Sequence, residues 1–434
     1  MNIDELKKIQ IMQDENFGFH VKFNNAEDKY AQISKDLIGL FGEIGEFSNI
    51  IKKITIKNEM KDSYELDLPL AEKHLKEEII DCLIYILRIS AILEVNIEDE
   101  VLNKMRINRK KYEKLKNKKI FFLPVNTGYG SEHSPNCELI DFYRKRSSNS
   151  IYCSIVGNVV IPNGYKSNNY CIKISNNTNW RNLTFEIKSQ GSKPGIQLSS
   201  AWDGYIGNLH FVAKQSENPE KYYLDAINSI DESKINEIIR DLRHGISLSI
   251  DNGFEHIQIH AAHGYLFSLL LDNYFSKYAD LFQHELSNIF SELKNHNIET
   301  SLRISVKTGI YRIDKKRDNI IKNLSSIPTD YIDLSSGFYN INKNLIYPST
   351  SSMLKKRYED SIKLINQFKN RKFIISGKSL SLFDKILPEN VDVGICRDLI
   401  ANPNFITKPD LKCNDCGDCH YYSLGKDKLN CSLW

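Results

Sequence analysis

From residue 120 onwards the sequence alternates between short β-branched apolar runs and longer amphipathic stretches, such as 223–251, 265–294 and 352–368. Regular alternation of strands and helices is typical of α/β folds built on a parallel sheet. A doubly wound open sheet and a (β/α)8 barrel both produce it. The count of eight runs and the absence of a G-x-G-x-x-G turn favour the barrel. The eight predicted strands are 120–125, 153–161, 195–199, 255–260, 301–306, 331–335, 372–376 and 392–396.

The first 118 residues follow a different pattern. Between 26 and 56 the apolar residues recur at spacings of three and four, which predicts one face of a long helix. Two further helices are predicted over 71–93 and 97–116. The sequence therefore predicts a multi-domain protein: an all-α helical domain over 1–118, a barrel over 119–410 and a cysteine-rich segment over 411–434, with the Lys-rich stretch 114–119 as linker.

Composition limits the partners that such a chain can have. Hydrophobic residues make up 41% and charged residues 26%, values that exclude a disordered or fibrous protein. A net charge of +3 provides no basic surface for nucleic acid. No apolar run approaches the ~18 residues of a membrane span, and the N-terminus MNIDELKKIQ lacks the apolar core of a secretory signal. We expect a cytoplasmic protein with neither a nucleic-acid nor a membrane partner.

Four acidic residues stand at helical spacing within apolar stretches of the first domain: Glu43 and Glu46, then Glu78 and Asp81. Residues three apart share one face of a helix. Most such acids lie on solvated faces, and that interpretation stays open. If the two pairs converge between helices, their charges repel one another unless a hard divalent cation such as Mg²⁺ bridges them.

Three segments of this domain, in order, resemble the MazG-type all-α nucleotide pyrophosphohydrolases, and the last of them is closest to the dCTP pyrophosphatase branch. They are GEIGEF (42–47), EEIIDCLIY (77–85) and KMRINRKKY (104–112). The resemblance implies that Glu43, Glu46, Glu78 and Asp81 bind Mg²⁺. It further implies that Lys104 and Asn108 contact the phosphates and sugar of a nucleoside triphosphate, and that the domain forms dimers or tetramers. The insertion over 57–70 departs from the family pattern.

In the predicted barrel, polar and glycine residues gather where strands end, which is where barrel active sites are built. Glycine and arginine after the last two strands form a phosphate-binding arrangement. The residues at these positions are Thr127, Gln197, His260, His263, Tyr265, Arg303, Ser336, Gly337, Gly377 and Arg397.

Five segments of the barrel resemble the old yellow enzyme family of NADH:flavin oxidoreductases. The most specific is IQIHAAHGYL (257–266), and the others are GIQL (195–198), LRIS (302–305), DYIDLSSG (330–337) and RDLIANP (397–403). The resemblance implies a non-covalent FMN. Gln197 and Thr127 would contact its pyrimidine edge, Arg303 would stabilise the anionic reduced flavin, and Gly377 and Arg397 would hold its phosphate. Ser336 and Gly337 would belong to the same cofactor site.

The same resemblance assigns the catalytic residues. His260 and His263 would donate hydrogen bonds to a substrate acceptor, and Tyr265 would supply the proton after hydride transfer from flavin N5. Two segments that shape the substrate mouth in the family differ here, namely 199–204 and the stretch after Leu266. The reducible substrate is therefore not assigned.

Four cysteines close the sequence in the pattern C-x2-C-x2-C-x11-C: Cys413, Cys416, Cys419 and Cys431. Both a zinc site and a four-iron, four-sulfur cluster use such ligands. Three close thiols with one remote thiol favour the cluster, as in dienoyl-CoA reductase-like relatives of the barrel. Zinc and free thiols remain alternatives.

Taken together, these patterns predict a bifunctional enzyme: a Mg²⁺-dependent pyrophosphohydrolase fused to an FMN and iron–sulfur reductase. The electron donor is NAD(P)H or a ferredoxin or flavodoxin. The fusion suggests a nucleotide-derived substrate for the reductase, and a homo-oligomer formed through the helical domain. In one alternative the helical domain only senses nucleotides or oligomerises. In another, the protein is a nucleotide-binding scaffold without turnover.

Overall fold

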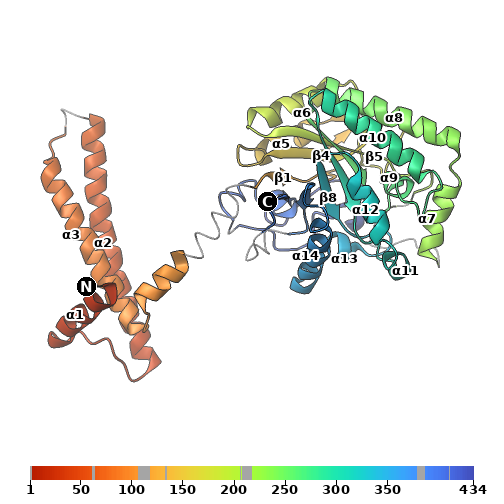
Figure 1. Ribbon diagram of the computed structural model, residues 1–434. Helices are drawn as coiled ribbons and strands as arrows, with labels where there is room; N and C mark the ends of the chain where they lie inside the picture. Colours follow the sequence, from red (N-terminus) through yellow and green to blue (C-terminus); the bar gives the residue numbers. More distant parts are fainter. Residues whose placement is uncertain are drawn as a thin grey trace. The chain divides into compact units, whose positions relative to one another are not determined.

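The computed structural model describes residues 2–60, 64–105, 118–131, 134–205, 207, 218–378, 387–409 and 411–434. The chain divides into two compact units, Met1–Glu113 and Lys114–Trp434 (Figure 1). The division falls at the start of the Lys-rich stretch 114–119. No helix in the described ranges is both long and apolar enough to cross a membrane.

The first unit is helical, as predicted. Its helices are α1 (Ile3–Asn16), α2 (Ala26–Met60), α3 (Leu68–Ile92) and a helix over 97–105. Side-chain caps fix where two of them begin: Asn2 and Glu5 form a capping box at α1, and Asp67 accepts a hydrogen bond from the Leu70 amide at α3. Helices α2 and α3 lie side by side along their length (Figure 1). The part of the predicted third helix beyond residue 105 lies outside the described residues.

One buried arginine connects the three long helices of this unit. Arg88 on α3 donates to Asp14 of α1 at 2.6 Å and to Asp36 of α2 at 3.4 Å. All three side chains are buried. Because a buried charge is costly unless it is paired, this cluster fixes how α1 and α2 pack on α3.

The second unit is a closed parallel barrel in the order β1-β10-β9-β8-β7-β6-β5-β4. Strand β1 closes it by pairing with both β4 and β10. Each predicted strand corresponds to one observed strand, so the predicted (β/α)8 barrel is confirmed. The bounds are β1 Ile120–Phe122, β4 Cys153–Val160, β5 Lys193–Ser199, β6 His256–Ala261, β7 Glu299–Ser305, β8 Tyr331–Ser335, β9 Lys372–Ile375 and β10 Val391–Ile395.

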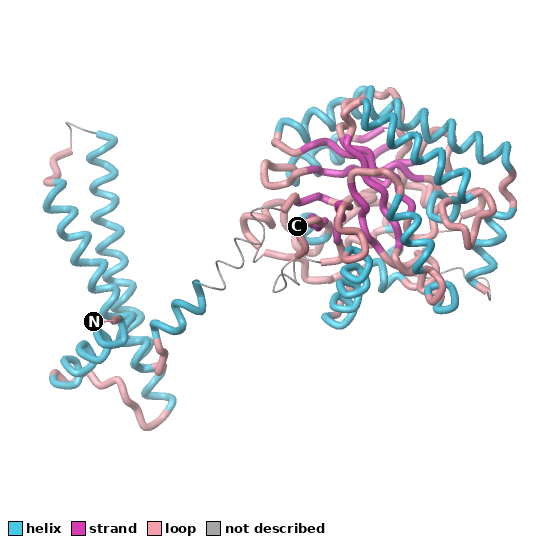
Figure 2. Tube along the Cα trace, viewed as in Figure 1, coloured by secondary structure: helices cyan, strands magenta, loops and turns pink. Residues whose placement is uncertain are grey.

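Helices surround the strands, as Figure 2 shows for the second unit. They are α5 Cys137–Arg146, α6 Thr178–Ser189, α7 Pro219–Asn228, α8 Glu232–Asp251, α9 Leu266–Leu270, α10 Ala279–Asn295, α11 Tyr311–Asp314, α12 Asp318–Ser326, α13 Lys343–Ile346, α14 Ser351–Ile365, α15 Arg397–Ala401 and the 3-10 helix η4 Tyr422–Leu424. A hairpin of β2 (Gly130–Ser131) and β3 (Ser134–Pro135) was not predicted, because two-residue strands leave no periodicity in a sequence.

Two predicted helical stretches are each two helices. The stretch 223–251 breaks where Asp231 caps α8 by accepting a hydrogen bond from the Lys234 amide. The stretch 265–294 breaks after α9, where the fully buried Asp272 forms an ion pair with Arg317. In both places the helix is interrupted at a side-chain interaction although the apolar pattern of the sequence continues.

A polar cluster closes the amino-terminal end of the barrel strands. The Glu299 carboxylate accepts hydrogen bonds from Tyr152 at 2.6 Å and from His256 at 2.9 Å, and Lys193 lies 3.3 Å away. Burial alone raises the pKa of Glu299, but the hydrogen bond and charge of His256, together with Tyr152 and Lys193, lower it to about 2. The carboxylate is therefore bound in its charged form.

We predict that Glu299→Gln destabilises the barrel at neutral pH by about 2 kcal/mol. A carboxyl group whose folded pKa lies below its ordinary 4.5 stabilises fully above that value. This stabilisation is lost as the pH falls toward about 2. Denaturant unfolding at several pH values measures the difference. Glu255→Gln, which removes an exposed partner of Lys188, is the control. A Glu299→Gln effect that stayed constant from pH 7 to pH 3 would contradict the prediction.

Candidate functional site

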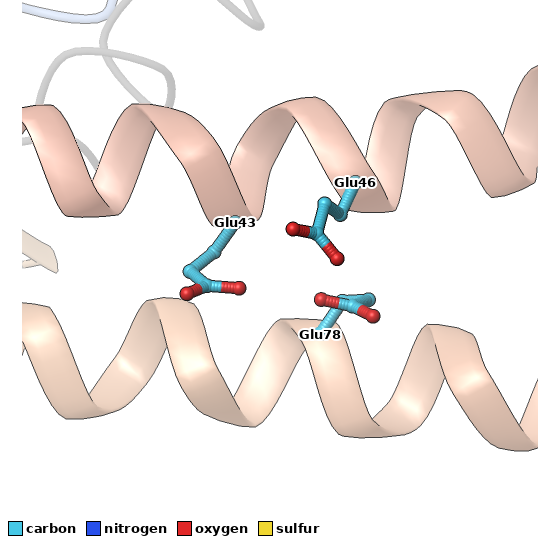
Figure 3. Close-up of side chains that lie close together, drawn as sticks. All are labelled: Glu43, Glu46 and Glu78. Atoms are coloured by element: carbon cyan, nitrogen blue, oxygen red, sulfur yellow. The ribbon is translucent and has the colours of Figure 1, made fainter.

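In the first unit, three of the predicted metal ligands lie together. Glu43 and Glu46 on α2 face Glu78 on α3 (Figure 3), and one ligand oxygen from each lies within 4.8 Å of the others. Asp81 is exposed one turn further along α3 and is not a member of this group. Lys104 is exposed on the helix over 97–105, and Asn108 lies outside the described residues. The structure thus brings together three of the six residues.

The charges of this acidic group act on Glu78. Its pKa is raised, first by desolvation and then by the charges of Glu46, Glu43 and Asp81. Asp81 therefore contributes to the local potential although it is not within ligand distance. A cation bound between α2 and α3 would relieve this repulsion, and three carboxylates offer the oxygen ligands that Mg²⁺ prefers.

In the second unit, a cavity opens at the carboxyl ends of the strands. Several predicted residues line it, and they come from both sides of the barrel. From the middle strands come His260, Arg303 and Gln197, and from the last two strands come Gly377 and Arg397. His263 and Tyr265, in the turn after β6, line it as well.

The turn after β6 orients the two histidines. His260 lies near the end of β6, and its ring centroid is 5.1 Å from that of His263 and 5.2 Å from that of Tyr265. His263 has a positive φ of 64° and Gly264 one of 77°. A Cβ on Gly264 would lie 2.8 Å from Phe338, so glycine is required there. The His263 amide donates to the Ser305 hydroxyl at 2.9 Å, and its Nε2 lies 2.6 Å from the Ser335 hydroxyl.

Burial determines the protonation of this group. It lowers the pKa of His260 well below the ordinary 6.5, and the charge of Arg303 lowers it further. The pKa of His263 is lowered in the same way by burial, by His260 and by Arg303. Burial also raises the pKa of the Tyr265 hydroxyl. At neutral pH two neutral imidazoles and a protonated phenol therefore face the cavity, and all three can donate hydrogen bonds.

A buried polar network connects the strands below the cavity. Gln197 Nε2 donates to Gln258 at 2.6 Å, and Gln258 donates to Asp333 at 3.2 Å. Arg303 Nη1 donates to the same Asp333 oxygen at 2.9 Å. In the described part of the chain, Arg303 Nε and His260 Nδ1 are buried without a hydrogen-bond partner. Such unsatisfied groups beside a cavity indicate a missing polar ligand.

The opposite end of the cavity carries positive charge. Ser376, Gly377 and Lys378 follow β9, and Arg397 follows β10. A Cβ on Gly377 would lie 2.9 Å from Nε of Arg357, so a side chain there would collide with this buried arginine. Because Gly377 has no side chain, the backbone of this turn and the cations of Lys378 and Arg397 can come close to a ligand at this end of the cavity.

Three predicted cofactor residues do not line the cavity. The Thr127 carbonyl instead accepts a hydrogen bond from the Leu429 amide at 2.7 Å, so this residue anchors the C-terminal segment. Ser336 and Gly337 form a buried turn, in which the Gly337 amide donates to the Lys307 carbonyl at 2.7 Å. They lie outside the lining because a strand end contributes to a cavity only through the one or two positions that face it, and their contact with a cofactor stays a prediction.

The cavity also contains residues that the sequence did not single out. Asn126, the neighbour of Thr127, lines the cavity, and Lys378 adds a second cation beside Arg397. In the sequence, only their position could have identified these two residues, because each stands directly beside a predicted site residue. Tyrosines supply much of the remaining lining: Tyr205, Tyr339, Tyr347, Tyr421 and Tyr422.

The four C-terminal cysteines line one further cavity. All four thiols are free. This cavity and the barrel cavity share a wall. The residues that line both are Tyr347, Arg397, Ile400, Cys419 and His420.

The spacing of the thiols bears on what they could hold. In the ranges that the structure describes, the acidic group of the first unit is the only one in which three possible ligand atoms lie within 4.8 Å of one another. A tetrahedral zinc with bonds of ~2.3 Å would bring its sulfurs to about 4 Å apart. In the described ranges, no three of these thiols lie within 4.8 Å of one another. The Asp415 amide donates to the Cys413 sulfur at 3.4 Å, a contact suited to a thiolate.

Fold and site together define a parallel (β/α)8 barrel with a donor-rich cavity at the carboxyl ends of its strands. Residues 109–415 match the NADH:flavin oxidoreductase / NADH oxidase family, and the chain belongs to this family. It is similar to the NADPH dehydrogenase of Bacillus velezensis, with 33% identity over 91 residues. It is also similar to the NADPH dehydrogenase of Bacillus subtilis, with 33% identity over 89 residues. Each match covers 19% of this chain and 25% of the relative.

Proposed function

We propose that the barrel is an FMN-dependent oxidoreductase that reduces an activated double bond. The observation that carries the proposal is the composition of the cavity. His260, His263 and Tyr265 are its neutral hydrogen-bond donors, and Arg397 and Lys378 are its cations. Family membership supports the flavin, and the name of the two relatives supports NADPH as electron donor. The substrate is an uncharacterised reducible small molecule, and a nucleotide-derived compound is our hypothesis.

The residues present fit an FMN. Arg303 Nε is buried without a partner in the described residues, as expected for a donor that awaits a ligand. Gln197 and Arg303 would hold the pyrimidine edge, with Asn126 in place of Thr127. The Gly377 turn and Arg397 would hold the phosphate.

When bound, FMN supplies a hydride to the substrate. The protein residues orient the acceptor and move the proton. The neutral imidazoles of His260 and His263 donate hydrogen bonds that polarise a substrate carbonyl or similar group. The Tyr265 hydroxyl, protonated because burial raises its pKa, delivers a proton to the neighbouring carbon. Arg303 adds positive charge beside the site in which negative charge develops.

We further propose that Cys413, Cys416, Cys419 and Cys431 hold a four-iron, four-sulfur cluster. Their shared cavity, their spacing in the sequence and the amide-to-sulfur contact at Cys413 support it. When bound, the cluster supplies single electrons. Cys419 lies in the wall shared with the barrel cavity, so electrons would have a short path. A ferredoxin or flavodoxin would then be an alternative donor to NAD(P)H.

A visible spectrum and an iron assay on protein purified without oxygen test both cofactors. We expect the bands of bound flavin, a broad cluster shoulder and about four irons per chain. Cys416→Ser should lose most of the iron and keep the flavin. Cys137→Ser, which removes another exposed thiol, is the control and should keep both. Flavin without iron would refute the cluster, and a colourless protein would refute the flavin.

For the first unit we propose a Mg²⁺-dependent nucleoside triphosphate pyrophosphohydrolase. Glu43, Glu46 and Glu78 support it because they converge between two helices and the pKa of Glu78 is raised by its neighbours. Asp81 would join them as a ligand after a side-chain rotation, and Lys104 and Asn108 would contact the nucleotide. When bound, Mg²⁺ would activate a water for attack on phosphorus, so that the bond between the α and β phosphates breaks and pyrophosphate leaves.

Pyrophosphate release from a panel of nucleoside triphosphates, dCTP included, tests this proposal. We expect Mg²⁺-dependent release and a loss of about 100-fold or more in Glu78→Gln, because one of three converging ligands is gone. Glu77→Gln is the control, since Glu77 pairs with Lys73 outside the acidic group. If the wild-type chain released no pyrophosphate from any nucleotide, the alternative function as a nucleotide sensor or an oligomerisation module would be favoured.

We propose that the first unit also forms a homo-oligomer. Large apolar side chains on α2 and α3 are exposed within one copy, among them Ile38 at 73%, Phe41 at 65% and Ile80 at 53%. Large apolar side chains exposed in this number on two neighbouring helices are typical of an interface. Light scattering on the full chain should give a mass of two or more copies, and Phe41→Glu should lower it. A wild-type mass of one chain would contradict the proposal.

A further inference from the structure

The two cations at one end of the barrel cavity are already paired with an anion that the chain itself supplies from the wall of the cysteine-lined cavity. Asp415 lies in the turn between Cys413 and Cys416, and its carboxylate reaches both cations. Arg397 Nη1 donates to Asp415 Oδ1 at 3.0 Å, and Lys378 pairs with Oδ2. Arg397 uses Nη2 to donate to the Pro348 carbonyl at 2.8 Å. Both cationic side chains are largely buried, so little water screens these pairs.

The carboxylate is held in place by the backbone of its turn. Asp415 has a positive φ of 60°, a conformation that aspartate tolerates better than most residues. The Asp415 amide donates to the Cys413 sulfur at 3.4 Å, and the Cys416 amide donates to the Asn414 side chain at 3.2 Å. The position of this anion is therefore coupled to the position of the cysteine turn.

We propose that Asp415 is an internal competitor for the phosphate of the flavin. This inference rests on the proposed flavin site, in which Arg397 and the Gly377 turn take the phosphate. A carboxylate and a phosphate cannot both approach the same two cations without repelling each other. Phosphate offers more charge and more acceptor oxygens, so it displaces Asp415 and takes Arg397 and Lys378. Entry of a flavin that carries a phosphate therefore shifts the cysteine turn, whereas riboflavin leaves the pair intact.

Flavin binding to the full chain, freed of its flavin by dialysis against a chaotropic salt without oxygen, tests this. The dissociation constants of FMN and riboflavin are measured from flavin fluorescence, and their ratio isolates the contribution of the phosphate. We expect Asp415→Asn to increase the ratio of the riboflavin to the FMN dissociation constant by about tenfold, equivalent to ~1.4 kcal/mol. Inorganic phosphate should likewise compete with FMN more strongly in this variant.

The control is Asp418→Asn, which removes an equal charge from the same segment. In the described residues Asp418 pairs with neither Arg397 nor Lys378, so its ratio should match the wild type. Asp415→Ser provides a second variant in case the first does not fold. An unchanged ratio, or weaker FMN binding with riboflavin unaffected, would overturn the proposal. Wild-type protein that binds neither flavin would instead refute the flavin site on which it rests.

Discussion

The second unit depends on a short parallel pairing. Strand β1 contributes only Ile120–Phe122, yet it pairs with β10 on one side and β4 on the other, and so closes the sheet into a barrel. Because every strand runs in the same direction, closure brings the carboxyl ends of all eight to one rim. His260, Arg303, Gly377 and Arg397 are far apart in the sequence, and they line one cavity only because the barrel is closed.

The C-terminal segment then adds a second layer to that rim. The Leu429 amide donates to the Thr127 carbonyl, the Tyr129 hydroxyl donates to the Leu429 carbonyl, and the Trp434 indole donates to the Ile400 carbonyl. These contacts hold the cysteine-lined cavity against the barrel cavity, with Cys419 and His420 in the common wall. They also bring Asp415 to the cationic end. The packing of the C-terminal segment against the barrel thus positions the thiols, the wall shared by the two cavities and the Asp415 carboxylate.

The first unit contains two groups of acidic side chains whose charges are balanced differently. In one, Arg88 neutralises Asp14 and Asp36, so these acids stabilise the packing of three helices. In the other, further along the same helices, Glu43, Glu46 and Glu78 lie close together, and the pKa of Glu78 is raised by desolvation and by the charges of its acidic neighbours. The acids paired with Arg88 are explained by the packing of the helices. The converging acids are not, and this contrast is why the second group is the functional candidate.

The sequence by itself determined the two architectures, the eight strands and most of the polar residues of the site, because periodicity and strand-end position are local properties. Helical spacing placed Glu43 with Glu46, and Glu78 with Asp81, on one face of each helix and left open whether the pairs converge; the structure brings Glu43, Glu46 and Glu78 together. Only the tertiary structure decided which strand-end residues face the cavity. Asn126 lines it whereas Thr127 does not, and Ser336 and Gly337 lie in a turn outside its lining. The contact of Asp415 with Arg397 and Lys378 was equally beyond the sequence. This contact joins segments that are brought together by closure of the barrel and by packing of the C-terminal segment against it. Neither the closure nor the packing leaves a local pattern in the sequence.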